Sequence, residues 1–499
     1  MKSVFAFAGT ALAACAAFAA EMEKSTPEAE GISSAAIGAW IDACERELDA
    51  LHGFVVVRHG KTIAEGWWSP FSADRTHMLY SHSKSFTSTA VGFLADDGKL
   101  NLDERIVDVF PEKAPTNRPG ADLSVRALRV RDLLTMTTGM AYTDAERKEP
   151  AGDWVRLFLE NEVTDLPGVK YRYDSCATHV LAAIVERKSG KKLMDFLDER
   201  LFREIGITRA WTTTSPQGIA CGGWGMNMTT RELARFGQLY LQQGRWGDRQ
   251  LISTNWVRLA TGYQTSTGRP GDGDWSQGYG FQFWRCRHNC YRADGAHGQY
   301  TVVMPDQDAV VSIHAGLGPM HKELDLVWQY LLPAMQAKAL PEDPAAQKAL
   351  ADRCAALALK TVKGERVGRV ALGRTYRLSG AQKRFNFRSV RLAEAEGGWK
   401  IVLDSPAGEQ SIPLGYGAWR EGVARFEEEL FEKLGGLVGD QPTAGSGAWT
   451  APNVFRARVY LHNGTFRIDY TFAFKDDATL EFNTDLFGMG GGKWTLKGE

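Results

Sequence analysis

Apolar residues recur at helical spacing through much of the first two thirds of the chain. Ser33 and Ser34 precede apolar positions three and four residues apart, which predicts a capped helix extending to about residue 51. Similar patterns predict helices over 81–94, 128–140, 178–188 (ending before Gly190), 231–241 and 324–331. Short apolar or alternating runs predict strands over 54–57, 62–64, 279–284, 300–304 and 310–314.

The pattern changes after Pro333. A linker containing Pro341 and Pro344 leads into an alanine-rich helix predicted over 345–359, and short strand-like runs dominate from Tyr376 onward. His462-Asn463-Gly464 is a hairpin signal between two such runs. The sequence therefore predicts a first domain over 21–335, a linker and helix over 336–374, and a β-rich C-terminal domain over 375–499.

The first twenty residues differ from the rest. Lys2 is followed by an uncharged run from Val4 to Ala20, which is typical of a signal peptide over 1–20, with cleavage expected after Ala19. The alternative is a lipobox, Leu12-Ala13-Ala14-Cys15, that would attach a lipid to Cys15. No later run is apolar for 18 residues, so we expect a periplasmic or secreted mature protein without a transmembrane segment.

Composition excludes some functions. The 59 Lys and Arg residues nearly balance the 60 Asp and Glu residues, which argues against a nucleic-acid partner. Seven cysteines include Cys286 and Cys290, which flank a predicted turn. A disulfide there or two free thiols are favoured over a metal site that would add His288. Gly271-Asp-Gly-Asp274 is interpreted as a polar loop rather than a calcium site, so no metal or cofactor is expected.

Three common enzyme signatures are missing: Gly-x-Ser-x-Gly, His-Glu-x-x-His and the Walker phosphate loop. Ser-x-x-Lys occurs twice, and the copy at Ser189–Lys192 is interpreted as a solvated turn. The copy at Ser81–Lys84 opens a helix of small residues, where positions i and i+3 share a face, so Lys84 can reach the Ser81 hydroxyl. A desolvated lysine can activate a serine nucleophile, although a capping serine beside a surface lysine is the alternative.

The surroundings of Ser81 narrow the choice. Five stretches follow one another along about 31–335: Ser81–Lys84, Arg131–Gly139, Tyr171–Ser175 with the helix to Gly190, Gly222–Gly237 and Gly295–Tyr300. In this order they resemble the serine β-lactamase/penicillin-binding protein superfamily. Within it, the chain is most similar to the class C-like branch of esterases and amide hydrolases, which includes aminohexanoate-dimer hydrolases. The resemblance implies a mixed α+β fold, an antiparallel sheet flanked by helices with a helical subdomain. The C-terminal domain is expected to be an all-β sandwich or small barrel.

The resemblance also implies residue roles. Ser81 would be the acylating nucleophile, Lys84 its activating amine and Tyr173 a proton shuttle, with either Lys84 or Tyr173 as the main base. The backbone N–H groups of Ser81 and Gln299 would form the oxyanion hole.

Two departures bear on the substrate. Ser175 stands where β-lactamases usually have Asn, and Ala296-His297-Gly298 replaces their Lys-Thr-Gly, so a cation for the β-lactam carboxylate is missing. Ser175, His297 and Gly298 are expected to contact substrate. An esterase or amidase acting on a small ester, amide or peptide-like molecule is therefore ranked above a β-lactamase or D,D-carboxypeptidase, and above an inactive ligand-binding protein.

Overall fold

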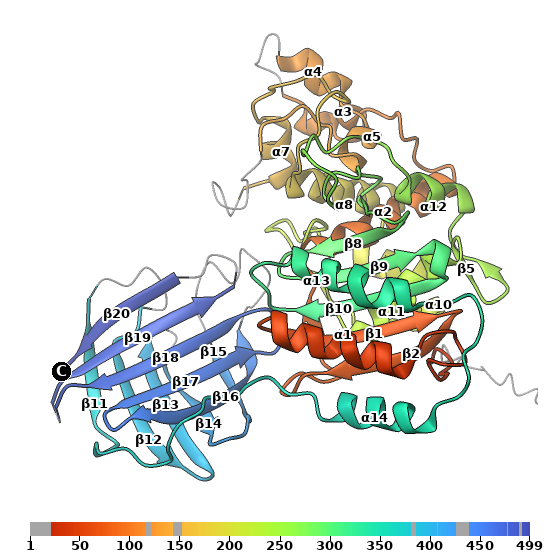
Figure 1. Ribbon diagram of the computed structural model, residues 1–499. Coiled ribbons are helices and arrows are strands. Elements are labelled where there is room, and N and C mark those ends of the chain that lie inside the picture. Colours follow the sequence, from red (N-terminus) through yellow and green to blue (C-terminus); the bar gives the residue numbers. More distant parts are fainter. Residues whose placement is uncertain are drawn as a thin grey trace, which may run out of the picture.

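The computed structural model describes residues 21–115, 121–142, 152–380, 386–406, 408–425, 439–476, 478–488 and 492–499. The expected signal peptide and Cys15 lie outside these residues, so export stays a prediction. None of the helices formed by the described residues is both long enough and apolar enough to span a membrane. Figure 1 shows a helical layer above a sheet, with a separate β domain beside the sheet.

A six-stranded antiparallel sheet in the order β2-β1-β10-β9-β8-β7 forms the centre of the first domain. Both faces of β1 are buried: Val55 and Val57 contact one apolar cluster, whereas Phe54 and Val56 contact another. The strands are β1 (Leu51–Arg58), β2 (Lys61–Trp67), β7 (Trp284–Arg285), β8 (Tyr291–Gly295), β9 (Gln299–Met304) and β10 (Ala309–Ala315). Two short pairs lie elsewhere, namely β3 (His77–Met78) with β4 (Asn227–Met228), and β5 (Arg245–Trp246) with β6 (Arg249–Gln250).

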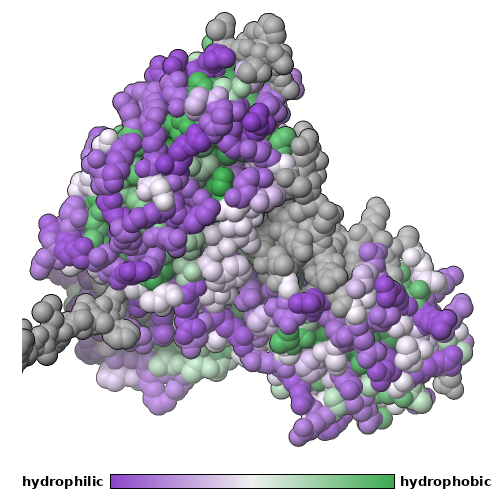
Figure 2. All heavy atoms as spheres, turned by 180° about the vertical axis from the view of Figure 1, so that it is seen from behind, coloured by the Kyte–Doolittle hydropathy of each residue, from purple (hydrophilic) through white to green (hydrophobic). Residues whose placement is uncertain are grey.

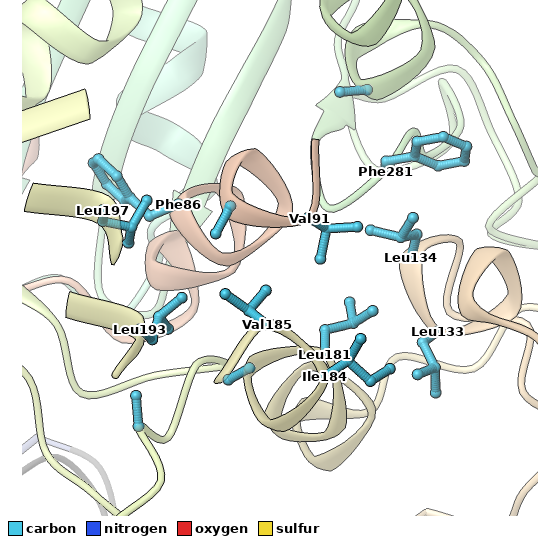
Figure 3. Packing of buried hydrophobic residues seen from close by; sticks show 14 of the residues in the cluster. Phe86, Val91, Leu133, Leu134, Leu181, Ile184, Val185, Leu193, Leu197 and Phe281 are labelled. Atoms are coloured by element: carbon cyan, nitrogen blue, oxygen red, sulfur yellow. The ribbon is translucent and has the colours of Figure 1, made fainter. Parts of the chain in front are cut away.

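Helices cover both faces of this sheet. The pair formed by α2 and α8 buries Val91, Leu181 and Val185 between its members, as Figure 3 shows. Gly190 ends α8 in a left-handed conformation, as the sequence predicts. The helices are α1 (Ser34–Glu47), α2 (Ser83–Asp96), α3 (Ile106–Val109), α4 (Ala121–Ala127), α5 (Val130–Leu134), α7 (Trp154–Leu159), α8 (Ser175–Ser189), α9 (Leu193–Leu197), α10 (Arg203–Ile205), α11 (Thr230–Leu241), α12 (Thr254–Thr261), α13 (His321–Leu326) and α14 (Pro344–Ala355).

Two predicted elements differ from the structure. The helix expected over 128–140 is reduced to α5, because Met136 and Gly139 adopt positive φ angles of 60° and 72°. The strand expected over 279–284 is a buried loop that reaches a sheet only at β7. Two hydroxyl groups of α2 satisfy carbonyl groups of this loop. Ser85 Oγ donates to the Gln282 carbonyl at 2.8 Å, and Ser88 Oγ donates to the Phe281 carbonyl at 2.7 Å.

The hairpin of β7 and β8 forms as predicted, and of the two alternatives left open at its turn, a disulfide or free thiols, the structure has the second. Cys286 and Cys290 are both free and buried. The Cys286 thiol accepts a hydrogen bond from Arg292 Nη1 at 3.1 Å, and the Cys290 thiol donates to the His288 carbonyl at 3.2 Å. Each sulfur thus has a polar contact of its own, and the free-thiol alternative describes this site.

Residues 271–274 form a loop, as expected, but its last residue, Asp274, is fully buried. Its carboxylate accepts hydrogen bonds from the Arg287 side chain at 2.9 Å and from Trp328 Nε1 at 3.0 Å. Arg287 reaches the Asp325 carboxylate as well, at 2.6 Å. The guanidinium therefore supplies the positive charge between these two acidic side chains.

The C-terminal domain is a closed barrel, one of the two expected architectures. Nine strands follow the order β14-β13-β12-β11-β20-β19-β18-β17-β16, a β14–β16 bridge closes the ring, and β15 pairs with the outer side of β16. Aromatic and aliphatic side chains fill the interior, whereas Figure 2 shows a mainly hydrophilic surface on the face seen from behind. The strands are β11 (Thr375–Ser379), β12 (Ser389–Ala395), β13 (Gly398–Ser405), β14 (Gly408–Gly415), β15 (Arg420–Arg425), β16 (Asp440–Ala451), β17 (Val454–Leu461), β18 (Arg467–Phe474), β19 (Leu480–Phe487) and β20 (Gly492–Gly498).

The turn between β17 and β18 contacts the first domain directly. The Asn463 carbonyl accepts a hydrogen bond from the Met78 N–H at 3.0 Å. The hydroxyls of Thr465 and Tyr80 lie 2.8 Å apart, and the Met78 and Tyr80 side chains join the apolar cluster of the barrel. The barrel thus contacts the short segment that leads into Ser81.

Buried histidines predict how stability depends on pH. Burial lowers the pKa of all six, for example to about 4 in His77 and about 3 in His462, whereas an unfolded histidine titrates near 6.5. Above pH 6.5 these groups are neutral in both states. As pH falls to 5 only the unfolded chain takes up protons, so each of these histidines lowers the free energy of unfolding, by about 2 kcal/mol for a pKa that falls to about 4 as in His77. The six are His52, His77, His82, His179, His314 and His462.

Urea unfolding at pH 7.5 and pH 5 measures this effect, and we expect the free energy of unfolding to be lower at pH 5. Three buried carboxyls with raised pKa values, Asp132, Asp294 and Glu323, act in the opposite direction, but six histidines outweigh them. A free energy of unfolding that stays level or rises as the pH falls would contradict the prediction.

Candidate active site

Ser81 lies in a single 3-10 turn, Tyr80–His82, immediately before α2. The sequence predicts the first turn of the helix, and the structure places Ser81 just ahead of it. Tyr80 has a φ of 47°, a left-handed conformation that costs a non-glycine residue about 1–3 kcal/mol. The Tyr80–Thr465 contact and the surrounding apolar cluster hold this conformation.

Lys84 is in the first turn of α2 and only 1% exposed, so the alternative of a surface lysine is wrong. Its Nζ donates to Ser81 Oγ at 3.0 Å, to Ser175 Oγ at 2.9 Å and to the Gly223 carbonyl at 2.6 Å. An ammonium group has three donors, and here three oxygen atoms surround it. The nitrogen is therefore fixed within proton-transfer distance of the candidate nucleophile.

Tyr173 comes immediately before α8, where Asp174 caps the helix by accepting from Cys176 N. Its hydroxyl forms a hydrogen bond with Ser81, and its ring lies 4.7 Å from Lys84 Nζ. Burial raises the pKa of Tyr173, and the bond to Ser81 offsets only part of that rise. The phenol is therefore protonated at neutral pH and is suited to donate a proton.

Ala296-His297-Gly298, which replaces the Lys-Thr-Gly of β-lactamases, forms the turn between β8 and β9, next to the 3-10 turn that contains Ser81. Gly295 pairs with Gln299 across the hairpin. The side-chain amide of Gln299 is fully buried and donates to the Ala296 and Ala315 carbonyls at 3.1 and 2.6 Å. This arrangement fixes the start of β9, where the predicted second oxyanion-hole N–H belongs.

The part of the chain that holds these residues matches a known protein family. A profile described as Beta-lactamase matches residues 41–335, more than half of the chain. The chain belongs to the Beta-lactamase family. Together with the hydrolases among its relatives, this makes it a serine hydrolase.

Two curated relatives and one solved structure illustrate the family. The 6-aminohexanoate-dimer hydrolase of Paenarthrobacter ureafaciens is 28% identical over 280 residues, which are 52% of this chain and 70% of that protein. A D-aminopeptidase of Cereibacter sphaeroides is 27% identical over 35% of this chain and 37% of its own length. A Bacillus anthracis structure described as a candidate 6-aminohexanoate-dimer hydrolase shares the fold, with a TM-score of 0.54 and 20% identity over 65% of this chain and 90% of that one.

Two expected substrate contacts of this Beta-lactamase family member have other partners in the structure. Ser175 Oγ is a hydrogen-bond acceptor for Lys84. His297 packs between Tyr80 and Phe487, at ring-centroid distances of 5.5 and 5.7 Å, and its Nδ1 donates to the Leu317 carbonyl at 3.1 Å. Burial lowers the pKa of His297, so it does not replace the missing lysine as a cation.

Gly298 is the last residue of the turn between β8 and β9. It has a φ of 90°, and a Cβ at this position would come within 2.2 Å of Glu323 Oε2. Glycine is therefore required here by both the backbone conformation and the close approach of α13.

Sequence reasoning missed several residues around Ser81. The Gly223 carbonyl belongs to the Gly222–Gly237 stretch, which carries part of the family resemblance but for which that resemblance implies no role. Asp294 and Arg292 form a buried ion pair on β8 at 2.7 Å, and the Asp294 carboxyl acts electrostatically on Tyr173. In the sequence, Arg292 and Asp294 are only two charged residues at alternate positions, and this pattern does not indicate that both side chains are buried beside the site.

Proposed function

We propose that this serine hydrolase cleaves carboxylic esters or amides through an acyl-enzyme on Ser81. The observation that carries the proposal is the buried Lys84, whose Nζ lies 3.0 Å from Ser81 Oγ and is held by Ser175 and the Gly223 carbonyl. A serine hydroxyl needs a base before it can attack a carbonyl carbon, and no other basic side chain is so placed among the described residues. Lys84 in its neutral form fills that role.

In the proposed reaction, Lys84 removes the Ser81 proton while Oγ attacks the substrate carbonyl. The backbone N–H groups of Ser81 and Gln299 stabilise the negative charge of the tetrahedral intermediate. Tyr173, which burial keeps protonated, donates a proton to the departing alcohol or amine and is reprotonated by Lys84. Water then attacks the acyl-enzyme by the reverse proton route and releases the acid.

The substrate is proposed to be a linear ester or amide rather than a β-lactam. Ala296 stands where β-lactamases have a lysine, and it carries no positive charge. The neighbouring His297 ring is neutral and packs against Phe487 of the barrel, so it does not replace that lysine. The name of the Paenarthrobacter relative gives a linear amide, the 6-aminohexanoate dimer, as the substrate of that protein. These two observations support the same substrate class.

The test compares wild type with Ser81→Ala on p-nitrophenyl acetate, 6-aminohexanoate oligomers and a chromogenic cephalosporin. We expect ester or oligomer turnover, an acetyl adduct on Ser81 by mass spectrometry and little cephalosporin turnover, with all activity lost in Ser81→Ala. Ser189→Ala is the matched control, because it changes the serine of the second Ser-x-x-Lys at a surface turn. Equal activity in wild type and Ser81→Ala, or no turnover and no adduct, would refute the proposal, and faster cephalosporin turnover would overturn the substrate ranking.

A further inference from the structure

Aromatic rings form a wall beside Tyr173, on the side of the site from which a proton reaches the leaving group. The Trp284 ring stacks on Tyr173 with centroids 5.8 Å apart, and Tyr171 lies 6.0 Å from Trp284. Trp275 meets Trp284 edge to face at 4.6 Å. The wall therefore leads from Tyr173 through the buried Trp284 to Trp275, which is partly exposed.

One unpaired cation lies over this wall. The guanidinium carbon of Arg269 lies 5.0 Å from the Trp275 centroid and 5.9 Å from the Trp284 centroid. Arg269 is exposed, and no carboxylate of the described residues forms an ion pair with it. Arg292 contacts the same two rings but is fully buried and paired with Asp294. The charge of Arg292 is thus already matched, whereas that of Arg269 is not.

A buried hydroxyl that belongs to the same aromatic wall has no partner either. The Tyr171 Oη is inaccessible to solvent and forms no hydrogen bond with any described residue. Tyr171 and Arg269 both lie beside Trp284, whose ring centroid is 6.0 Å from that of Tyr171 and 5.9 Å from the Arg269 guanidinium carbon, so the two residues border one aromatic ring. A buried hydroxyl without a partner is costly to a folded protein, and a ligand oxygen would satisfy it.

We propose that Arg269 and the Tyr171 hydroxyl form a subsite for a carboxylate carried by the leaving group of the substrate. This inference rests on the proposed function, because it places the leaving group on the Tyr173 side of Ser81. A guanidinium and a phenol are both hydrogen-bond donors, which suits a carboxylate that only accepts. Asp294, whose carboxyl acts on the Tyr171 phenol, is held by Arg292 at 2.7 Å and forms no ion pair with Arg269. A linear amide whose amine half ends in an acid group meets these requirements.

Calorimetric titration of the full chain carrying Ser81→Ala measures binding without turnover. The two ligands are the 6-aminohexanoate dimer and the same dimer with a C-terminal carboxamide, which differ in one charge and hardly in shape. We expect the acid to bind about tenfold more tightly, which corresponds to about 1.4 kcal/mol, and the difference to shrink as salt is added. Adding Arg269→Ala should abolish the preference, Arg269→Lys should keep part of it, and Tyr171→Phe should reduce it.

Arg374→Ala in the same background is the matched control, because Arg374 is an exposed arginine that also stacks on an aromatic ring, Tyr376 of the barrel, at 5.5 Å. It should keep the full preference for the acid. Equal binding of acid and carboxamide, no binding of either, or a preference that survives Arg269→Ala would overturn the subsite. Because Ser81→Ala removes the nucleophile, these outcomes are independent of whether the acyl-enzyme reaction itself is confirmed with p-nitrophenyl acetate.

Discussion

Replacing Lys84 with methionine is expected to slow acylation of Ser81 by about 10³- to 10⁴-fold, the upper range of a general acid–base contribution. Methionine has a similar length and fits the buried position, but it cannot accept the Ser81 proton. The rate of p-nitrophenolate release in the first turnover measures acylation directly, and mass spectrometry reports the acetyl adduct on Ser81. The loss should appear in kcat rather than in KM, because Lys84 contacts Ser81 Oγ and not the bound substrate.

The stability of the Lys84→Met variant separates a lost base from a lost fold. Burying an ammonium group costs desolvation energy, so an apolar side chain of similar volume often leaves stability unchanged or higher. The change also leaves the Gly223 carbonyl without its 2.6 Å donor, which opposes that gain. We therefore expect a melting temperature close to that of wild type. Lys192→Met is the control, because it changes the exposed lysine of the second Ser-x-x-Lys sequence, Ser189–Lys192, and it should keep full activity. If Lys84→Met is acylated at a rate within tenfold of wild type, Lys84 is not the base.

Local sequence spacing predicted the parts of the site that neighbouring residues determine. Ser81 and Lys84 share a helical turn, so their contact follows from an i, i+3 spacing. The His462–Gly464 turn and the end of α8 at Gly190 depend likewise on residues adjacent in the chain. Each of these features could be predicted because few conformations satisfy the local pattern.

Contacts between distant segments could not be predicted in the same way. The Gly223 carbonyl reaches Lys84 across 139 positions of the chain, and Thr465 reaches Tyr80 across 385. The apolar run at 279–283 resembles a strand, yet hydroxyls of α2 satisfy its carbonyl groups instead of a neighbouring strand. Periodicity records which residues are buried, and it does not record which polar partner meets their backbone.

Gly295 also packs against backbone that is distant in the sequence. We expect one added methyl group to damage the site most at this position. A Cβ at Gly295 would lie 2.0 Å from the Leu79 carbonyl, two residues before Ser81. That segment has little freedom to move, because Leu79 N donates to the Met226 carbonyl at 2.8 Å and Met78 N donates to the barrel. Since backbone cannot rotate away as a flexible side chain can, Gly295→Ala must shift the residues that hold Ser81.

We expect Gly295→Ala to lower kcat by about 100-fold, the usual consequence of displacing a reacting group by about 1 Å, and to destabilise the fold by about 1–3 kcal/mol. First-turnover acylation and urea unfolding measure the two effects. Gly38→Ala is the matched control, since nothing lies within 4 Å of a Cβ at this position in α1, and a helical Gly-to-Ala change should stabilise by about 0.5–1 kcal/mol with activity retained. If Gly295→Ala acylates as fast as Gly38→Ala, the contact between β8 and the segment before Ser81 does not position the nucleophile.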